Sequence, residues 1–222
     1  MAAAPTPIRV SAFRWVPPFA QGLVRDLRVR WALEEAGLPY EERLLARGDQ
    51  KGEFYLGLQP FGQVPAFEED GLVLFESGAI VLHIAERAEP LAPSDPAGRA
   101  RMQAWIFAAL NSVEPVVANL AEIDLFHADE DWAKQRRPGA VAAVEARLGL
   151  LAQRLGEREY LEDRFTAGDL MMTTVLRILR HTDILAKTPS LDAYRLRCEA
   201  RPAFQKAVAD QMAVFAANSP PG

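Results

Sequence analysis

The sequence predicts an α+β fold over residues 1–89 and an all-helical fold over residues 97–222, joined by a linker at 90–96. In the first part, short apolar runs of strand character alternate with helical patterns. Beyond the three prolines of the linker, apolar residues recur only at helical spacing. The chain has 222 residues, half of them hydrophobic, which is enough for two modest globular domains.

The first elements predict a β-α-β unit. Residues 8–13 alternate apolar and polar side chains as a strand does, and residues 40–45 supply a second strand. A right-handed crossover would make these two strands parallel. The helix between them ends at Gly37 and has apolar residues on one face: Val24, Leu27, Trp31 and Ala32. Three arginines are expected around its other face: Arg25, Arg28 and Arg30.

Residues 64–75 predict a β-hairpin, with Asp70 and Gly71 suited to the two positive-φ positions of a type I′ turn. Pro65 cannot donate a backbone hydrogen bond. Its strand must therefore lie at a sheet edge, or the Val64–Pro65 bond must be cis. A cis bond would present the N–H and C=O of Val64 outward, free to pair with an extended peptide.

A helix is predicted to begin at Glu76 and Ser77, directly after the hairpin. Its unpaired amides and positive dipole end, together with the Ser77 hydroxyl, suit a carboxylate, while Glu76 suits an ammonium group. A carboxylate beside an ammonium group is the head of an amino acid or of a γ-linked peptide. An ordinary helix cap at Ser77 and an edge strand at Pro65 are the alternative interpretations.

Two motifs, Pro60-Phe61-Gly62-Gln63-Val64-Pro65 and Phe75-Glu76-Ser77-Gly78-Ala79-Ile80, resemble the N-terminal domain of the glutathione transferase family. The resemblance runs from about Ile8 to Phe204. It implies a cytosolic, bacterial-type enzyme with a thioredoxin-like domain, an all-α domain, glutathione as co-substrate and a two-fold homodimer. The glutathione-binding residues that it implies are Lys51, Gln63, Val64, Pro65, Glu76 and Ser77.

The family activates the glutathione thiol with a tyrosine, serine or cysteine. Here Ala12-Phe13 and residues 19–24 offer neither a hydroxyl nor a thiol at the usual places. An ordinary thiol is only a few per cent ionised at neutral pH, so another group must favour the thiolate. The catalytic candidates are Ser11, Trp15 and Arg25. Four residues are candidates for the pocket of a hydrophobic co-substrate: Trp15, Phe19, Trp105 and Asn111.

In the helical part, Pro115 interrupts an apolar helical stripe and predicts a kink near Asn111. Thr166 and Asp169 predict a capping box at the start of another helix. Further helices are expected over residues 138–155 and from Pro202 onward.

Composition argues against several classes of function. The net charge of −5 and the lack of a basic stripe argue against nucleic acid as a partner. No apolar run approaches the roughly 20 residues of a membrane span, and the N-terminus lacks a signal-peptide pattern, so we expect a cytoplasmic protein. The single cysteine, Cys198, excludes a disulfide framework. The acidic stretch around His127 is interpreted as a solvated loop, and no metal is expected.

The leading hypothesis is a detoxifying enzyme that transfers the glutathione thiolate to a small hydrophobic electrophile, or acts on glutathione mixed disulfides or thioethers. A lyase, a disulfide reductase and an isomerase remain open. The alternative from another class is a non-catalytic binding or interaction protein that keeps the fold. Retention of the paired ammonium and carboxylate sites favours the enzyme, whereas the missing hydroxyl favours the binding protein.

Overall fold

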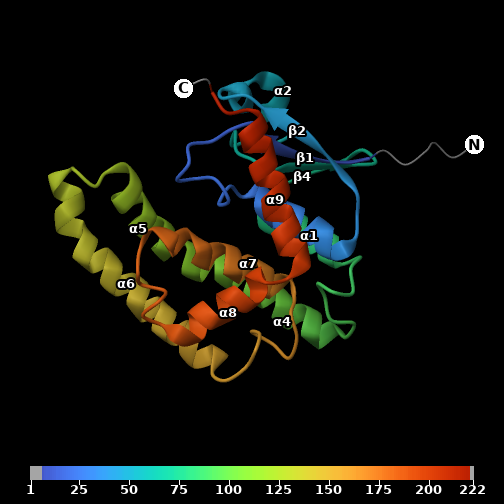
Figure 1. Ribbon diagram of the computed structural model, residues 1–222. Helices are drawn as coiled ribbons and strands as arrows, with labels where there is room; N and C mark the ends of the chain where they lie inside the picture. Colours follow the sequence, from blue (N-terminus) through green and yellow to red (C-terminus); the bar gives the residue numbers. More distant parts are fainter. Residues whose placement is uncertain (1–6, 221–222) are drawn as a thin grey trace, which may run out of the picture. The chain divides into compact units, whose positions relative to one another are not determined.

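The computed structural model describes residues 7–220 and divides the chain into two compact units (Figure 1). The first unit comprises the described parts of Met1–Leu91 and Pro202–Gly222, and the second comprises Ala92–Arg201. The chain thus leaves the first unit after the sheet and its helices, and returns to it with the last helix.

The first unit contains a mixed four-stranded sheet of order β2-β1-β3-β4. Strand β1 (Ile8–Phe13) is parallel to β2 (Tyr40–Leu45), which confirms the predicted crossover. Strand β3 (Ala66–Glu69) is antiparallel to β1 and to β4 (Leu72–Phe75). This β-α-β unit followed by a hairpin is the expected thioredoxin-like arrangement.

Local signals in the sequence place the turns of this unit correctly. Asp70 and Gly71 have φ values of 45° and 84°, as the predicted type I′ turn requires. Gly37 adopts the left-handed conformation, with φ 65°, and ends the first helix. The helices of the unit are α1 (Asp26–Ala36), η1 (Asp49–Lys51), α2 (Glu53–Leu56), α3 (Ser77–Ala85) and α9 (Pro202–Ala217).

Helix α1 is more deeply buried than its pattern predicts. Arg28 and Arg30, expected on a solvent-facing side, are 3% and 1% exposed, whereas Arg25 is exposed as expected. Asp26, in the first turn of the helix, is also buried. The amphipathic interpretation was wrong for the two buried arginines because each has a buried polar partner: Arg28 donates to Ser77, and Arg30 pairs with Asp26. The Nε atom of Arg30, for example, lies 2.7 Å from the Asp26 carboxylate.

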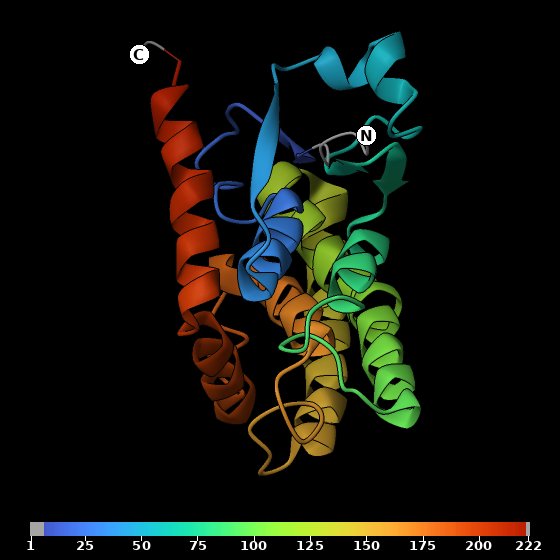
Figure 2. The ribbon, with the colours of Figure 1, turned by 90° about the vertical axis from the view of Figure 1, so that its right-hand side faces the viewer.

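Helix α9 lies alongside α1 and belongs to the first unit, as both ribbon views show (Figures 1 and 2). The sequence division had assigned all of residues 97–222 to the helical domain, so the structure corrects it for this last helix. The ring of Trp31 in α1 meets that of Phe204 in α9 edge-on, with centroids 4.7 Å apart. Lys206 pairs with Glu34 at 3.0 Å. These contacts bury the apolar face of α9 against α1.

The second unit is helical throughout its regular structure. Its segments are α4 (Pro96–Phe107), η2 (Ala108–Val113), α5 (Glu114–Phe126), α6 (Asp131–Leu155), α7 (Ala167–Leu176), η3 (Arg177–His181) and α8 (Pro189–Glu199). Segment η2 is a π-helix that interrupts the run immediately before Pro115. The predicted disturbance near Asn111 is therefore present, because Pro115 offers no N–H to the carbonyl four residues earlier.

Two other expectations for this unit need correction. Helix α6 begins at Asp131, not at Pro138, which lies inside the helix. In addition, the helical run Pro96–Phe126 has the length and hydropathy of a membrane span, although 44% of its apolar window is buried inside the protein. Core helices of water-soluble proteins pass the same test, so this run is weak evidence for a membrane.

The carboxylate of Asp169 holds together three segments of the second unit. It accepts hydrogen bonds from the backbone N–H of Thr166 at 2.8 Å, the backbone N–H of Leu161 at 2.9 Å and the hydroxyl of Tyr194 at 2.9 Å. The Thr166 hydroxyl in turn accepts from the N–H of Gly168. This confirms the predicted capping box. Burial, together with the Asp169 charge, raises the pKa of the Tyr194 hydroxyl well above its ordinary value, so this hydroxyl remains a donor.

Substitution of Asp169→Asn should lower the free energy of unfolding by about 2–4 kcal/mol, because three buried donors lose a charged acceptor. Urea unfolding followed by circular dichroism measures this change. Asp163→Asn, at an exposed position a few residues earlier, is the matched control and should have little effect. An Asp169→Asn protein as stable as the control would contradict the structural role of this carboxylate.

Candidate functional site

The Val64–Pro65 peptide bond is cis and lies immediately before β3. Among the described residues, no hydrogen bond engages the backbone N–H or C=O of Val64. These two groups therefore keep the capacity to pair with an extended peptide, as the sequence suggested.

A chain of hydrogen bonds holds this turn in place. The backbone N–H of Ala66 donates to Ser11 Oγ at 2.6 Å. The Ser11 and Tyr55 hydroxyls lie 2.7 Å apart, and the Tyr55 hydroxyl donates to the carbonyl of Gln63 at 2.7 Å. Because Tyr55 has only one hydroxyl proton, Ser11 must donate to Tyr55. The chain thus fixes the residues on both sides of Val64 and Pro65, and it gives the catalytic candidate Ser11 a structural task inside the core.

The preceding turn depends on Gln59, a buried residue that the sequence reasoning did not identify. Its Oε1 atom accepts from the backbone N–H groups of Phe61 at 2.7 Å and Gln63 at 3.1 Å. Gly62 has φ 62°, and a Cβ atom there would lie 2.9 Å from the carbonyl oxygen of Gln50. Glycine is therefore required between these two bonded amides.

Glu76 and Ser77 lie at the N-terminus of α3, where the sequence placed them. Glu76 is the N-cap residue and has φ 66° and ψ 113°, an unfavourable conformation for a residue with a side chain. Strained residues of this kind cluster at binding and catalytic sites. The Glu76 side chain is exposed, and Ser77 is buried at the first turn. Together they present a carboxylate and a hydroxyl at the positive end of a nine-residue helix.

Arg28 is a site residue that the sequence reasoning missed. Its Nη1 atom donates to Ser77 Oγ at 3.1 Å from the neighbouring helix α1. Because the guanidinium occupies a lone pair of the serine oxygen, the hydroxyl proton is directed elsewhere and can be donated to a bound anion. The nearby positive charge favours that anion further. Only the unusual arginine content of α1 could have drawn attention to this position.

The remaining predicted binding residues surround the same turn on the first unit. Lys51 ends η1 and Gln63 precedes the cis bond, and both side chains are exposed. No ion pair engages Lys51 within the described part of the chain. Such side chains are available to a ligand but are not positioned by the protein alone.

The catalytic candidates Trp15 and Arg25 lie at the two ends of the loop between β1 and α1. Trp15 is half-buried, and Arg25 is exposed at the N-cap position of α1. Arg25 forms no side-chain capping bond with the helix, so the first amides of α1 are not capped by this residue. Phe19, in the same loop, is 43% exposed.

Trp105 and Asn111 belong to the second unit. The indole N–H of Trp105 donates to Glu162 at 2.9 Å, and the guanidinium of Arg154 lies 5.7 Å from the ring centre. A Cβ atom on Gly168 would lie 2.7 Å from that of Trp105, so α7 packs closely against this tryptophan. Trp105 thus has clear packing partners of its own. Its predicted role in a co-substrate pocket with Trp15 and Phe19 stays a prediction. Asn111 is exposed, and its predicted role in that pocket likewise stays a prediction.

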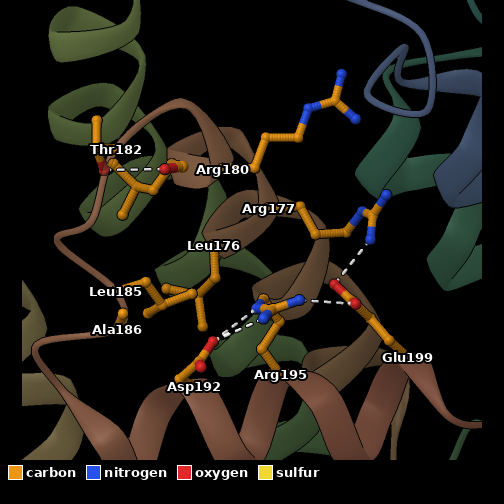
Figure 3. A pocket seen from close by; sticks show the side chains of 10 residues that line it. Leu176, Arg177, Arg180, Thr182, Leu185, Ala186, Asp192, Arg195 and Glu199 are labelled. Atoms are coloured by element: carbon orange, nitrogen blue, oxygen red, sulfur yellow. Dashed lines mark hydrogen bonds and ion pairs between the residues drawn. The ribbon is translucent and has the colours of Figure 1, made fainter.

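A hollow of about 260 Å³ in the second unit is lined by three arginines and two acidic residues (Figure 3). Arg195 donates to both Asp192 and Glu199, and Arg177 also donates to Glu199 at 2.7 Å. Since Arg177 and Arg195 are paired with the two carboxylates, we interpret this side of the hollow as part of a structural ion-pair network.

The single cysteine is not a nucleophile of this protein. Cys198 is buried, and burial raises the pKa of its thiol to about 12. The acidic stretch near His127 is likewise accounted for locally, since its ring nitrogens lie 2.6 Å from Glu130 and 3.3 Å from Glu122. Within residues 7–220, no group of three or more His, Cys, Asp or Glu is arranged to hold a metal.

A thioredoxin-like unit with a cis-proline turn, joined to a helical unit, defines the class of fold. A family model described as the N-terminal domain of glutathione S-transferase matches residues 21–86. A glutathione S-transferase from Hyoscyamus muticus is 33% identical over 197 residues, which cover 82% of this chain and 92% of that protein. The chain therefore belongs to the glutathione S-transferase family.

Further relatives agree with this assignment. Glutathione S-transferase APIC from Nicotiana tabacum is 31% identical over 196 residues, covering 81% of this chain and 90% of the tobacco protein. A glutathione transferase from Burkholderia graminis, solved with two glutathione molecules bound per subunit, is 29% identical. Its fold matches with a TM-score of 0.79 over 93% of this chain and 89% of that one.

Substitution of Tyr55→Phe should lower the free energy of unfolding by about 1–2 kcal/mol, because the Gln63 carbonyl and the Ser11 hydroxyl each lose a buried partner. Chemical denaturation measures the loss. Tyr160→Phe is the matched control, since no hydrogen bond of the Tyr160 hydroxyl is present in the described structure and its ring contacts would remain. Equal stability of the two variants would show that the hydroxyl chain does not hold the turn.

Proposed function

We propose that this protein binds glutathione on its first unit and transfers the glutathione thiolate to a small hydrophobic electrophile in the cytoplasm. The observation that supports the proposal most directly is the pair Glu76 and Ser77 at the N-terminus of α3, with the buried Arg28 directing the serine hydroxyl. Conjugation of this kind would serve detoxification.

Each part of the tripeptide has a suitable partner. The γ-glutamyl ammonium group would pair with Glu76, and its carboxylate would accept from the Ser77 hydroxyl and the first amides of α3. The cysteinyl backbone would pair with Val64 as an added strand, beside Pro65 and Gln63. The glycine carboxylate would face Lys51. Because these groups lie on one unit, binding requires no particular placement of the second unit.

The sulfur would lie near the start of α1, where the positive end of the helix dipole favours an anion. Arg25 adds a positive charge at this point, and the indole N–H of Trp15 is a second candidate donor. The thiol proton is released to solvent and the thiolate attacks the electrophilic carbon. As the sulfur–carbon bond forms, the bond from that carbon to its leaving group breaks, and the leaving group departs with the bonding electron pair. With an activated double bond, the π electrons move to the acceptor, which then takes a proton from solvent. The hydrophobic electrophile would contact Trp15 and Phe19 of the same loop.

Glutathione binding is tested by isothermal titration calorimetry. Both Arg28→Met and Ser77→Ala should weaken binding about 5- to 30-fold, the equivalent of one charge-assisted hydrogen bond. Arg87→Met, which removes an exposed arginine from the same unit, is the control and should bind normally. If wild-type protein releases no heat with glutathione, the binding proposal is wrong.

A spectroscopic titration of the bound thiol separates the enzyme from a non-catalytic binding protein. A transferase should lower the thiol pKa below its value in free glutathione, and Arg25→Ala or Trp15→Phe should reverse part of this shift. Normal binding with an unshifted thiol pKa would instead support the binding or interaction protein.

We also propose that the protein forms a homodimer through the edge of its sheet. Strand β4 is an edge strand, and exposed apolar residues gather there and on the preceding turn: Phe61, Leu72, Val73 and Phe75. Phe61 is 69% exposed, and its ring meets that of Phe75 edge-on with centroids 6.1 Å apart. A patch of this kind on a soluble protein is typical of an interface.

Substitution of Phe61→Glu should convert a dimer to a monomer, because a charge would be buried in the contact. Size-exclusion chromatography with light scattering measures the mass. Phe107→Glu, at a 56% exposed phenylalanine of the second unit, is the control and should leave the mass unchanged. A wild-type protein that is already monomeric would refute the proposal.

A further inference from the structure

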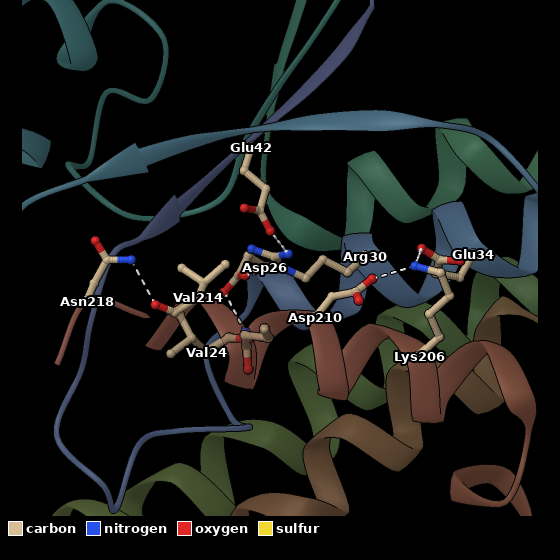
Figure 4. A network of polar contacts seen from close by, with 10 residues as sticks. Val24, Asp26, Arg30, Glu34, Glu42, Lys206, Asp210, Val214 and Asn218 are labelled. Carbon is tan, nitrogen blue, oxygen red and sulfur yellow. Dashed lines mark hydrogen bonds and ion pairs between the residues drawn. The ribbon is translucent and has the colours of Figure 1, made fainter. Parts of the chain in front are cut away.

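A buried polar network connects the last helix of the chain to the first turn of α1 (Figure 4). Gln211 of α9 is fully buried, and its Nε2 atom lies 2.9 Å from Asp26 Oδ1 and 3.4 Å from the carbonyl oxygen of Val24. The other oxygen of Asp26 accepts from Arg30 at 2.7 Å, and Arg30 also donates to Glu42 of β2. One amide group thus contacts both residues that flank Arg25.

The orientation of the Gln211 amide is dictated by these contacts. Its Oε1 atom has no hydrogen-bond partner among the described residues, which is unfavourable for a buried acceptor. The reverse orientation would place this oxygen against the Asp26 carboxylate, which is worse. An apolar side chain such as methionine would fill the same space without an unsatisfied oxygen. The amide group therefore contributes something other than packing at this position.

The Val24 carbonyl and the Asp26 carboxylate determine how α1 begins. The carbonyl accepts from the N–H of Leu27, which closes the first turn, and Gln211 approaches the same oxygen from outside. Asp26 carries a negative charge in the first turn of α1, the end of the helix near which the sulfur would lie. Arg30 balances this charge from within α1, and Gln211 of α9 donates to the other oxygen of the same carboxylate.

We propose that Gln211 is a positioning residue for thiol activation: from α9 it fixes Val24 and Asp26, so that Arg25 and the positive end of α1 are held in place to stabilise the thiolate. The inference rests on the proposed function. It assigns to the C-terminal helix a part in the chemistry, although no atom of that helix needs to touch glutathione. Loss of the Gln211 amide should therefore change ionisation of the thiol and leave binding of the tripeptide nearly intact.

The test is an ultraviolet titration of the glutathione thiolate bound to Gln211→Met. The thiol pKa should rise by about half a unit, which corresponds to about threefold less thiolate at a pH below the pKa. The dissociation constant for glutathione should change by less than about twofold, because Glu76, Ser77 and Val64 lie on other elements. Gln211→Asn keeps the amide but shortens the side chain, so it should raise the thiol pKa by a smaller amount. This variant replaces Gln211→Met in the test if the methionine variant does not fold.

Lys206→Met is the matched control, since it removes the exposed contact between α9 and Glu34. It should leave the thiol pKa unchanged even if it lowers the melting temperature. The inference would be overturned if folded Gln211→Met and Gln211→Asn kept the wild-type thiol pKa, or if Lys206→Met shifted the thiol pKa as much as Gln211→Met does. Either result would leave the proposed function standing. Wild-type protein that fails to lower the thiol pKa at all would remove the proposed function itself.

Discussion

The burial of α1 is the constraint on which the rest of the first unit depends. Its surroundings include β1, α3 and α9, and its first eight residues are all buried. Three of these residues carry charges, which would be costly to bury without partners. Asp26 is bonded to Gln211 of α9, Arg28 to Ser77 of α3, and Arg30 to Glu42 of β2 as well as to Asp26. The charges of one helix therefore join three other elements of the unit to it.

This arrangement connects the fold to the site. Arg28 neither touches solvent nor lies in a loop, yet it directs the hydroxyl expected to meet the ligand. Ser11 and Tyr55 likewise act from the core, by fixing the carbonyl of Gln63 and the amide of Ala66 on either side of the cis-proline turn. Groups that would contact glutathione are thus oriented by residues in the core behind them.

Features that depend on neighbouring residues could be predicted from the sequence. The strand at 8–13, the type I′ turn at Asp70 and Gly71, and the capping box of Asp169 follow from local patterns and are observed. The structural roles of Arg28 and Gln211 could not be predicted, because their hydrogen-bond partners lie 49 and 185 residues away in the sequence. Amphipathic reasoning assigns an isolated arginine to the surface. Only the tertiary structure shows that Arg28 donates to the buried Ser77 hydroxyl and Gln211 to the buried Asp26 carboxylate.

The return of α9 to the first unit has a consequence for synthesis of the protein. The sheet and its first helices emerge early from the ribosome, but the helix that covers Trp31 and meets Asp26 is translated only after the whole second unit. The apolar face of α1 and the Asp26 carboxylate are therefore not covered by α9 while the second unit is translated. During that interval the nascent chain exposes surface that a chaperone would recognise, and the first unit completes its core only after translation of the last helix.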